Sequence, residues 1–212
     1  MAVDLYWIPL GAGGRSVRFN GRVYEALIAA AQRRPRRDLY HAALVVTVGG
    51  ERYTIEIAPS PDAHEAARGV VATGAVGSRW LRPWRLFRYE VRCWRGGVIP
   101  DLAFARGGPR RVAGDPAAAH RVLDAVAAAP TPVWGRDELG AGEMWNSNSL
   151  ISWALEGAGV AAGAIRAPAG GRAPGWDAGL VVARRPAAAS APPPARETLH
   201  RGAAGAKGEA AR

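Results

Sequence analysis

The chain has 212 residues, of which 49% are hydrophobic, and its formal net charge is +10. This length suits one well-packed domain and is short for two. The sequence contains no run of about 18 apolar residues, and no basic stretch leads into an apolar core at the N-terminus. We therefore expect neither a membrane span nor a secretory signal, and a cytoplasmic location.

Metal-binding and disulfide patterns are missing from the sequence. Cys93 is the only cysteine, and the four histidines are scattered. Neither the Cys-x-x-Cys spacing nor the His-Glu-x-x-His spacing of zinc sites occurs. We expect no internal disulfide, no metal and no cofactor.

The positive charge comes almost entirely from arginine, because Lys207 is the only lysine among 28 basic residues. A basic chain can bind nucleic acid. These arginines are dispersed, however, except over residues 33–37 and 108–111, and such clusters are more typical of solvated loops. An arginine-rich nucleic-acid-binding module is therefore the weaker alternative.

Two short elements are predicted near the N-terminus. Residues 3–9 have the composition of a strand, which Pro9 and the following glycine-rich loop end. Asn20 can cap a helix over residues 22–33. The buried stripe of that helix would be Val23, Leu27, Ile28 and Ala31.

The most regular unit is a β-hairpin. Residues 39–48 and 51–59 have the composition of strands, and Gly49-Gly50 between them form a two-residue turn. This turn sets the register and predicts four cross-strand pairs on one face. The pairs are Val48 with Glu51, Val46 with Tyr53, Leu44 with Ile55 and Ala42 with Ile57.

The opposite face of the hairpin carries His41 and Glu56. With Ala43 opposite Glu56, His41 lies on the diagonal from that carboxylate, at a separation that long side chains can close. The pair suits a general base held by its orienting acid, and it equally suits a cross-strand contact at a sheet surface.

Further elements follow the hairpin in order. Residues 69–77 predict a strand, and the alternation over residues 86–94 predicts a half-buried strand with its arginines outward. Aromatic and basic residues interleave here, a pattern that also suits base stacking. Asp115-Pro116 then opens a helix from Ala117 to Ala128.

The stretch from Glu143 to Leu155 predicts a buried helix with a polar tip. Asn146 or Ser147 can cap its first turn, and its apolar residues recur at the spacing of a core-facing stripe. A hydroxyl on the first turn lies in the field of unpaired amides, which favours negative charge on its oxygen. The position suits a nucleophile, although capping is the commoner role for such residues.

The end of the chain is predicted to hold a last strand over residues 176–183. From about Pro186 onward, Ala, Pro, Gly and Arg dominate without periodicity. We therefore expect one domain over residues 1–185 and a disordered tail over residues 186–212.

The order of these parts resembles that of circularly permuted NlpC/papain-like proteins, a superfamily of cysteine peptidases and acyltransferases. A histidine on a strand precedes a helix whose N-terminus carries the nucleophile, and the resemblance covers Leu39 to Leu155. The NlpC motif runs Asp-Cys-Ser-Gly-Phe-Val. Asn146-Ser147-Asn148-Ser149-Leu150-Ile151 is similar to it, with Ser147 in the position of the cysteine.

The resemblance implies an α+β fold in which an antiparallel sheet packs against helices. It implies Ser147 as nucleophile, His41 as general base and Glu56 as orienting acid. The expected cleft lies between His41/Glu56 and the Ser147 helix. The residues expected to bind ligand around it are Trp134, Trp145, Asn146, Asn148 and Trp176.

Serine in place of cysteine raises the question of whether the site still catalyses a reaction or only binds a ligand. A thiol becomes a thiolate beside a histidine, whereas a serine hydroxyl must lose its proton to a base during attack. We expect a degenerate or serine-variant site that binds an amide- or ester-containing ligand, whether a small molecule, a peptide or a lipid-like molecule. The alternative is an active hydrolase or acyltransferase that uses Ser147.

Overall fold

The computed structural model describes residues 1–12, 24–59 and 69–186. Residues 13–23, 60–68 and 187–212 are outside the described part of the chain. The predicted Asn20 cap, the start of the predicted first helix and the predicted tail therefore lie outside it.

The fold is α+β, as predicted, and it is built on an antiparallel sheet. In the described residues the strands run β4-β5-β3-β2-β1-β6 across the sheet. A two-residue strand, β7 (Gly171–Arg172), pairs in parallel with the start of β2. The bounds of the six antiparallel strands are β1 Ala2–Pro9, β2 Asp38–Val48, β3 Glu51–Pro59, β4 Val70–Ala75, β5 Arg88–Arg95 and β6 Arg110–Ala113.

The β2–β3 hairpin has the register that its turn predicts. Leu44 pairs with Ile55, Val46 with Tyr53 and Val48 with Glu51. Gly49 and Gly50 both have positive φ, at 58° and 86°, as a tight turn that matches the strand twist requires. The fourth predicted pair, Ala42 with Ile57, is outside the β2–β3 ladder, which ends at Leu44 and Ile55; the Ala42 amide donates to the Asn148 side chain instead.

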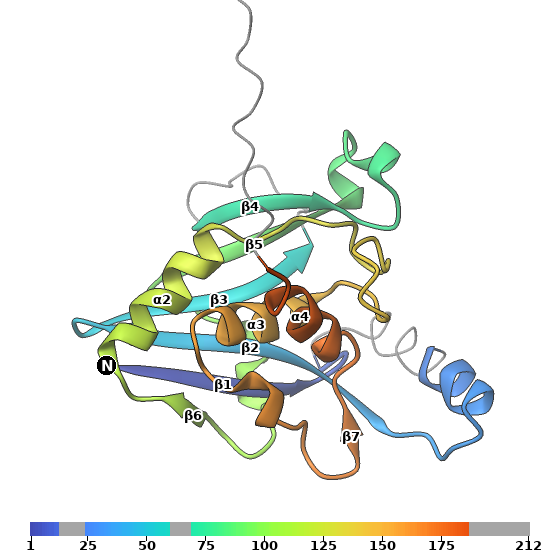
Figure 1. Cartoon of the computed structure of the whole chain (residues 1–212), viewed down its shortest axis with the longest axis horizontal. Coiled ribbons are helices and arrows are strands. Elements are labelled where there is room, and N and C mark those ends of the chain that lie inside the picture. The colour runs from blue at the N-terminus through green and yellow to red at the C-terminus, as the bar shows by residue number, and fades with distance from the viewer. Residues whose placement is uncertain (13–23, 60–68, 187–212) are drawn as a thin grey trace, which may run out of the picture.

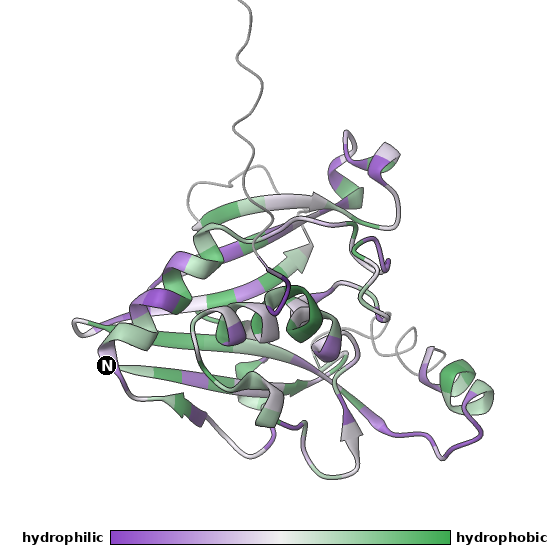
Figure 2. Cartoon of the chain, in the orientation of Figure 1, coloured by the Kyte–Doolittle hydropathy of each residue, from purple (hydrophilic) through white to green (hydrophobic). Residues whose placement is uncertain are grey.

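Helices cover one face of the sheet and enclose the main core. They are α2 (Pro116–Ala127), α3 (Ser147–Gly157) and α4 (Trp176–Ala183). As predicted, Asp115 caps α2, accepting from the amides of Ala117 and Ala118. Figure 2 shows β2 hydrophobic along most of its length, and Tyr40, Ala42, Leu44 and Val46 from it join the core beneath the helices.

The reverse face of the sheet has a smaller core. Ile8, Ala43 and Ile99 are buried there, beside the 3-10 helix η4 (Pro100–Phe104). Because side chains alternate along a strand, His41 belongs to this face, between Tyr40 and Ala42 of the helical face. The prediction that the arginines of β5 point outward is wrong for Arg92, which is only 8% exposed.

Residues 176–183 form α4 and not the predicted strand. Short apolar runs fit either element, and here packing decides. Gly175, with a φ of 85°, starts the helix, and Gly179 lets it approach α3 closely. The first helix also differs from its prediction: over residues 24–31 it buries Glu25 and Ala29, whereas Leu27 is 67% exposed.

The contact between α3 and α4 depends on the absence of a side chain at Gly179. A Cβ there would lie 2.1 Å from the Ser149 carbonyl oxygen and 2.1 Å from the Ser152 hydroxyl. We predict that Gly179→Ala lowers the free energy of unfolding by about 2 to 3 kcal/mol, because α4 must move away from α3. Chemical denaturation measures the change.

Gly157→Ala is the matched control. Gly157 ends α3, and a Cβ there would meet nothing within 4 Å. This variant should leave stability unchanged or raise it by up to about 1 kcal/mol. Equal effects at the two glycines would contradict the packing that we describe.

Candidate functional site

The first turn of α3 is capped from within its own sequence. The Asn146 side chain accepts from the backbone amides of Asn148 and Ser149 at 2.9 and 3.3 Å. In return the Ser149 hydroxyl accepts from the Asn146 amide at 3.1 Å. This capping box fixes the start of the helix at Ser147 and leaves Asn148 free to bond elsewhere.

Asn148 attaches this turn to the edge of β2. Its side-chain oxygen accepts from the Ala42 amide at 2.7 Å, and its side-chain nitrogen donates to the Tyr40 carbonyl at 3.0 Å. The same nitrogen donates to the Pro174 carbonyl at 2.8 Å. Asn148 thus takes the position on β2 that β3 would have filled, and it holds the backbone on both sides of His41.

Ser147 takes no part in the hydrogen bonds that fix this turn. It is 7% exposed, and within the described chain neither its hydroxyl nor its backbone amide has a hydrogen-bond partner. Asn146, Asn148, Ser149 and Ser152 all make side-chain hydrogen bonds. A donor amide and a hydroxyl therefore lie together, unpartnered, at the positive end of a helix.

His41 is half-buried on the reverse face of β2. Burial lowers the pKa of the imidazole below its ordinary value of 6.5, and the negative charge of Asp101 on η4 opposes part of that effect. The imidazole is therefore neutral at pH 7, the form that can accept a proton. In the described residues no hydrogen bond joins it to the Ser147 hydroxyl.

In the described residues Glu56 makes no ion pair with His41, the partner that the hairpin predicts for it. It forms an ion pair with Arg92, with 3.4 Å between the charged atoms, and Arg92 also bonds to the fully buried Glu90 at 2.8 Å. Burial raises the pKa of Glu56, although Arg92 acts against the increase. Arg92 takes this carboxylate because the two residues are direct partners in the β3–β5 ladder.

Two of the three tryptophans expected around the cleft belong to the core. Trp145 is 2% exposed, and Trp176 is 6% exposed with its ring 5.0 Å from that of Trp7. Both are buried because large apolar side chains next to α3 and α4 fill the space beneath those helices. Trp134 is half-buried and packs edge-on against Tyr89.

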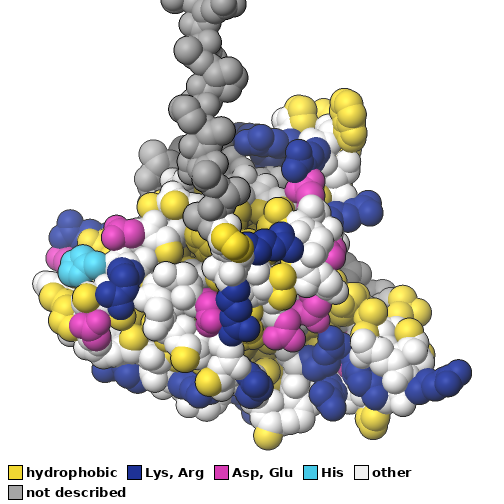
Figure 3. All heavy atoms as spheres, in the orientation of Figure 1, with side chains coloured by type: hydrophobic (Ala, Val, Ile, Leu, Met, Phe, Trp, Pro, Cys, Tyr) yellow, Lys and Arg dark blue, Asp and Glu magenta, His cyan; other side chains and the backbone are white. Residues whose placement is uncertain are grey.

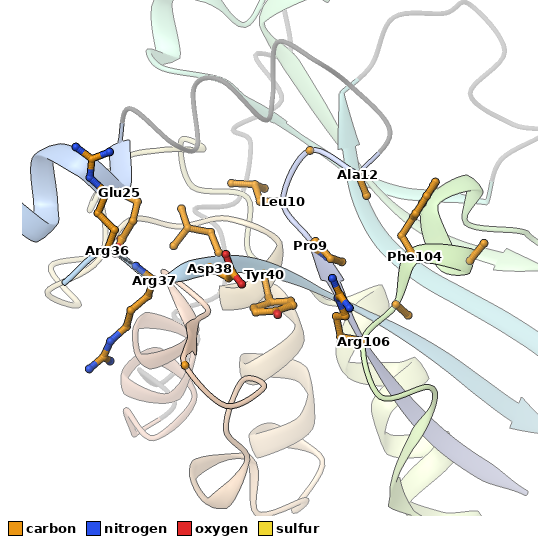
Figure 4. Close-up of a pocket in the computed structure, with 15 residues that line it drawn as sticks. Pro9, Leu10, Ala12, Glu25, Arg36, Arg37, Asp38, Tyr40, Phe104 and Arg106 are labelled. Atoms are coloured by element: carbon orange, nitrogen blue, oxygen red, sulfur yellow. Dashed lines mark hydrogen bonds between the residues drawn. The ribbon is translucent and has the colours of Figure 1, made fainter.

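A hollow of about 880 Å³ opens beside this site (Figure 4). Leu39 and Tyr40 line it, next to the backbone that Asn148 holds, whereas Ser147 and His41 do not. Arg37 and Arg106 extend from opposite sides of the hollow. The hollow lies at the start of β2, a segment that the sequence does not mark as a binding region.

Three further findings concern metal ligands, membrane spans and similar proteins. In residues 1–12, 24–59 and 69–186, no group of three or more His, Cys, Asp and Glu side chains could hold a metal. No helix within these ranges is both long and apolar enough to cross a bilayer. Comparison of the chain with known protein families, curated proteins and solved structures found no match.

The lowered pKa of His41 predicts a dependence of stability on pH. The unfolded chain protonates this histidine near pH 6.5, whereas the folded chain resists protonation until a lower pH. Stability therefore falls as the pH decreases through 6.5, by up to about 1.4 kcal/mol per pH unit. Denaturant unfolding of the native protein and of His41→Gln between pH 7 and pH 5 should show this loss in the native protein only.

His120→Gln is the matched control, because His120 is an exposed histidine on α2. That variant should keep the full pH dependence of the native protein. If His41→Gln keeps it as well, the imidazole is not protected from protonation in the folded chain.

Proposed function

We propose that the start of α3 binds the carbonyl group of an amide- or ester-containing ligand, as a serine variant of a permuted papain-like site that does not cleave what it binds. The order of the parts supports the resemblance. His41 on a strand precedes Ser147 on a helix, and the helix packs on an antiparallel sheet. Because the order of the elements does not by itself give a function, the groups at the site must supply the chemistry.

The observation that carries the proposal is the pair of unpartnered groups on Ser147. The Ser147 hydroxyl has no partner in the described residues and is not one of their fully buried side-chain atoms, so a ligand can approach it. The amide and hydroxyl of Ser147 can both donate to one oxygen at the positive end of the helix, which suits a carbonyl oxygen or an anion. The capping groups around them are already used within the protein.

Binding without cleavage follows from the surroundings of the hydroxyl. A serine attacks a carbonyl only if a base takes its proton, and that base must be within about 3 Å. In the described chain the hydroxyl has no such contact with His41, and Glu56 is paired with Arg92. The site thus has the groups that hold a carbonyl and lacks an aligned proton acceptor.

An active hydrolase or acyltransferase is the second candidate, and the state of His41 favours it. A neutral imidazole can act as a base, and the hydrogen bonds of catalytic groups often tighten only when a substrate binds. In that case His41 would take the Ser147 proton as the hydroxyl attacks the carbonyl. The leaving amine or alcohol would then take the proton from His41.

The hollow beside Tyr40 offers room for the rest of the ligand. Asn148 bonds to the Tyr40 carbonyl, so one wall of the hollow is joined directly to the first turn of α3. Charged side chains of both signs line it, among them Asp38, Arg37 and Arg106, and they favour a ligand that carries polar groups there.

A thiol at position 147 tests the site. In a Cys93→Ser background, Ser147→Cys should give a thiol with a lowered pKa, because the unpaired amides at the start of α3 stabilise a thiolate. We expect it to react with iodoacetamide at pH 6.5 about tenfold faster than an unperturbed thiol. Adding His41→Asn should leave that rate unchanged under the binding proposal, and a reduced rate would favour the active candidate.

The matched control is Ser78→Cys in the same background, because Ser78 lies in a loop where its side chain makes no cap hydrogen bond. If the Ser147→Cys thiol reacts no faster than the Ser78→Cys thiol, the site is contradicted, provided that denaturation does not reveal simple burial. Hydrolysis of 4-nitrophenyl acetate separates the two candidates. The binding proposal expects equal rates for the native protein and Ser147→Ala, and the active candidate expects a faster native protein.

A further inference from the structure

A projection at the β4 end of the sheet exposes large apolar side chains. We call residues 76–87, which connect β4 to β5, the aromatic projection. Trp80 is 91% exposed, Leu86 81% and Trp84 62%. Figure 1 shows the projection standing clear of the sheet, and Figure 3 shows hydrophobic side chains at its tip. Apolar groups gathered in this way mark an interaction surface more often than single exposed residues do.

The base of the projection is tied firmly to the domain. Its two ends are joined by the hydrogen bond from the Val76 amide to the Phe87 carbonyl at 2.7 Å. The Gly77 amide donates to the Trp134 carbonyl at 3.1 Å, and Arg136 donates to the Gly77 carbonyl at 2.9 Å. Two 3-10 turns, η2 (Arg79–Leu81) and η3 (Arg85–Phe87), order the tip.

Positive charge surrounds the apolar tip. Arg79, Arg82 and Arg85 are exposed and alternate with Trp80, Trp84 and Leu86 along the projection. Arg79 forms an ion pair with Glu138, which lies toward the domain. No acidic residue occurs between positions 76 and 87, so the projection itself is strongly basic.

We propose that the aromatic projection docks the protein on the surface of a lipid bilayer that contains anionic lipids. Tryptophan rings favour the boundary between head groups and acyl chains, and Leu86 adds an aliphatic group that can enter the bilayer. The arginines are attracted to anionic head groups at the same depth. Because the projection is already ordered, little conformational entropy is lost on docking.

The arrangement favours a bilayer over single-stranded nucleic acid, the alternative that aromatic and basic residues suggest in the sequence. Bases need exposed ring faces that follow one another along a groove. Here the ring of Trp84 packs against Phe87, with 6.3 Å between centroids and 53° between planes. Leu86, one of the most exposed apolar residues, offers no ring for stacking.

Co-sedimentation of the full-length protein with vesicles tests the proposal. One vesicle type is phosphatidylcholine alone, and the other contains roughly 30% phosphatidylglycerol as the anionic lipid. We expect binding to the second type, weakened by salt and at least about tenfold weaker with Trp80→Ser plus Leu86→Ser. Arg82→Glu should weaken it about fivefold or more.

Matched variants separate the projection from the rest of this basic chain. Val98→Ser plus Phe104→Ser removes two exposed apolar residues elsewhere, and Arg52→Glu makes the same charge change in the hairpin. Both should bind vesicles as the native protein does. Circular dichroism melting of each variant shows that a loss of binding is not a loss of folding.

Three results would overturn the proposal. Equal losses in the projection variants and in the matched variants would mean that total charge or apolar content drives binding. Binding of an oligothymidine that Trp80→Ser plus Leu86→Ser abolishes would assign the projection to nucleic acid. Concentration-dependent dimerisation in analytical ultracentrifugation, lost in the same variant, would assign it to a second copy of the chain.

Discussion

The hydrogen bonds of Asn148 are the interaction on which the arrangement of this protein depends. Beyond Leu44 the β2–β3 ladder ends, and the Ala42 amide would otherwise have no partner in the sheet. An unsatisfied buried amide costs about 1 to 3 kcal/mol. Asn148 supplies the acceptor and also a donor for Tyr40, so one side chain from α3 completes the edge of a strand more than 100 residues earlier in the chain.

The hydrogen bonds of Asn148 also fix the position of Ser147, the candidate ligand-binding residue. The residues on either side of Ser147 are fixed, Asn146 by the capping box and Asn148 by β2. Ser147 therefore has a defined backbone position next to the segment that carries His41, while its own amide and hydroxyl need no partner for the fold. A site built in this way can bind a carbonyl group without any change in the helix that presents it.

Turns and helix caps could be predicted from the sequence, because they depend on neighbouring residues. The predictions that differ from the structure concern contacts between residues far apart in the chain. The Gly49-Gly50 turn sets the hairpin register, and the polar tip of α3 indicates its cap, because both depend on neighbours in sequence. The hairpin pattern pairs Glu56 with His41, but in the structure Glu56 pairs with Arg92 of β5, and Asp101 is the acid whose charge acts on the His41 imidazole. Residues 176–183 form a helix that packs closely on α3 at Gly179, a contact that this segment alone does not reveal.

The most direct test of this account is hydrogen exchange at the Ala42 amide, measured by NMR. The Ala42 amide should exchange as slowly as the ladder amides of β2. In Asn148→Ala it should exchange at least about tenfold faster relative to them, since one buried bond is lost. The amide of Val46, which lies in the part of β2 that pairs with β3, serves as the reference within the same spectrum. Rapid exchange of Ala42 in the native protein, or an unchanged ratio in the variant, would contradict the claim that Asn148 holds α3 on the edge of β2.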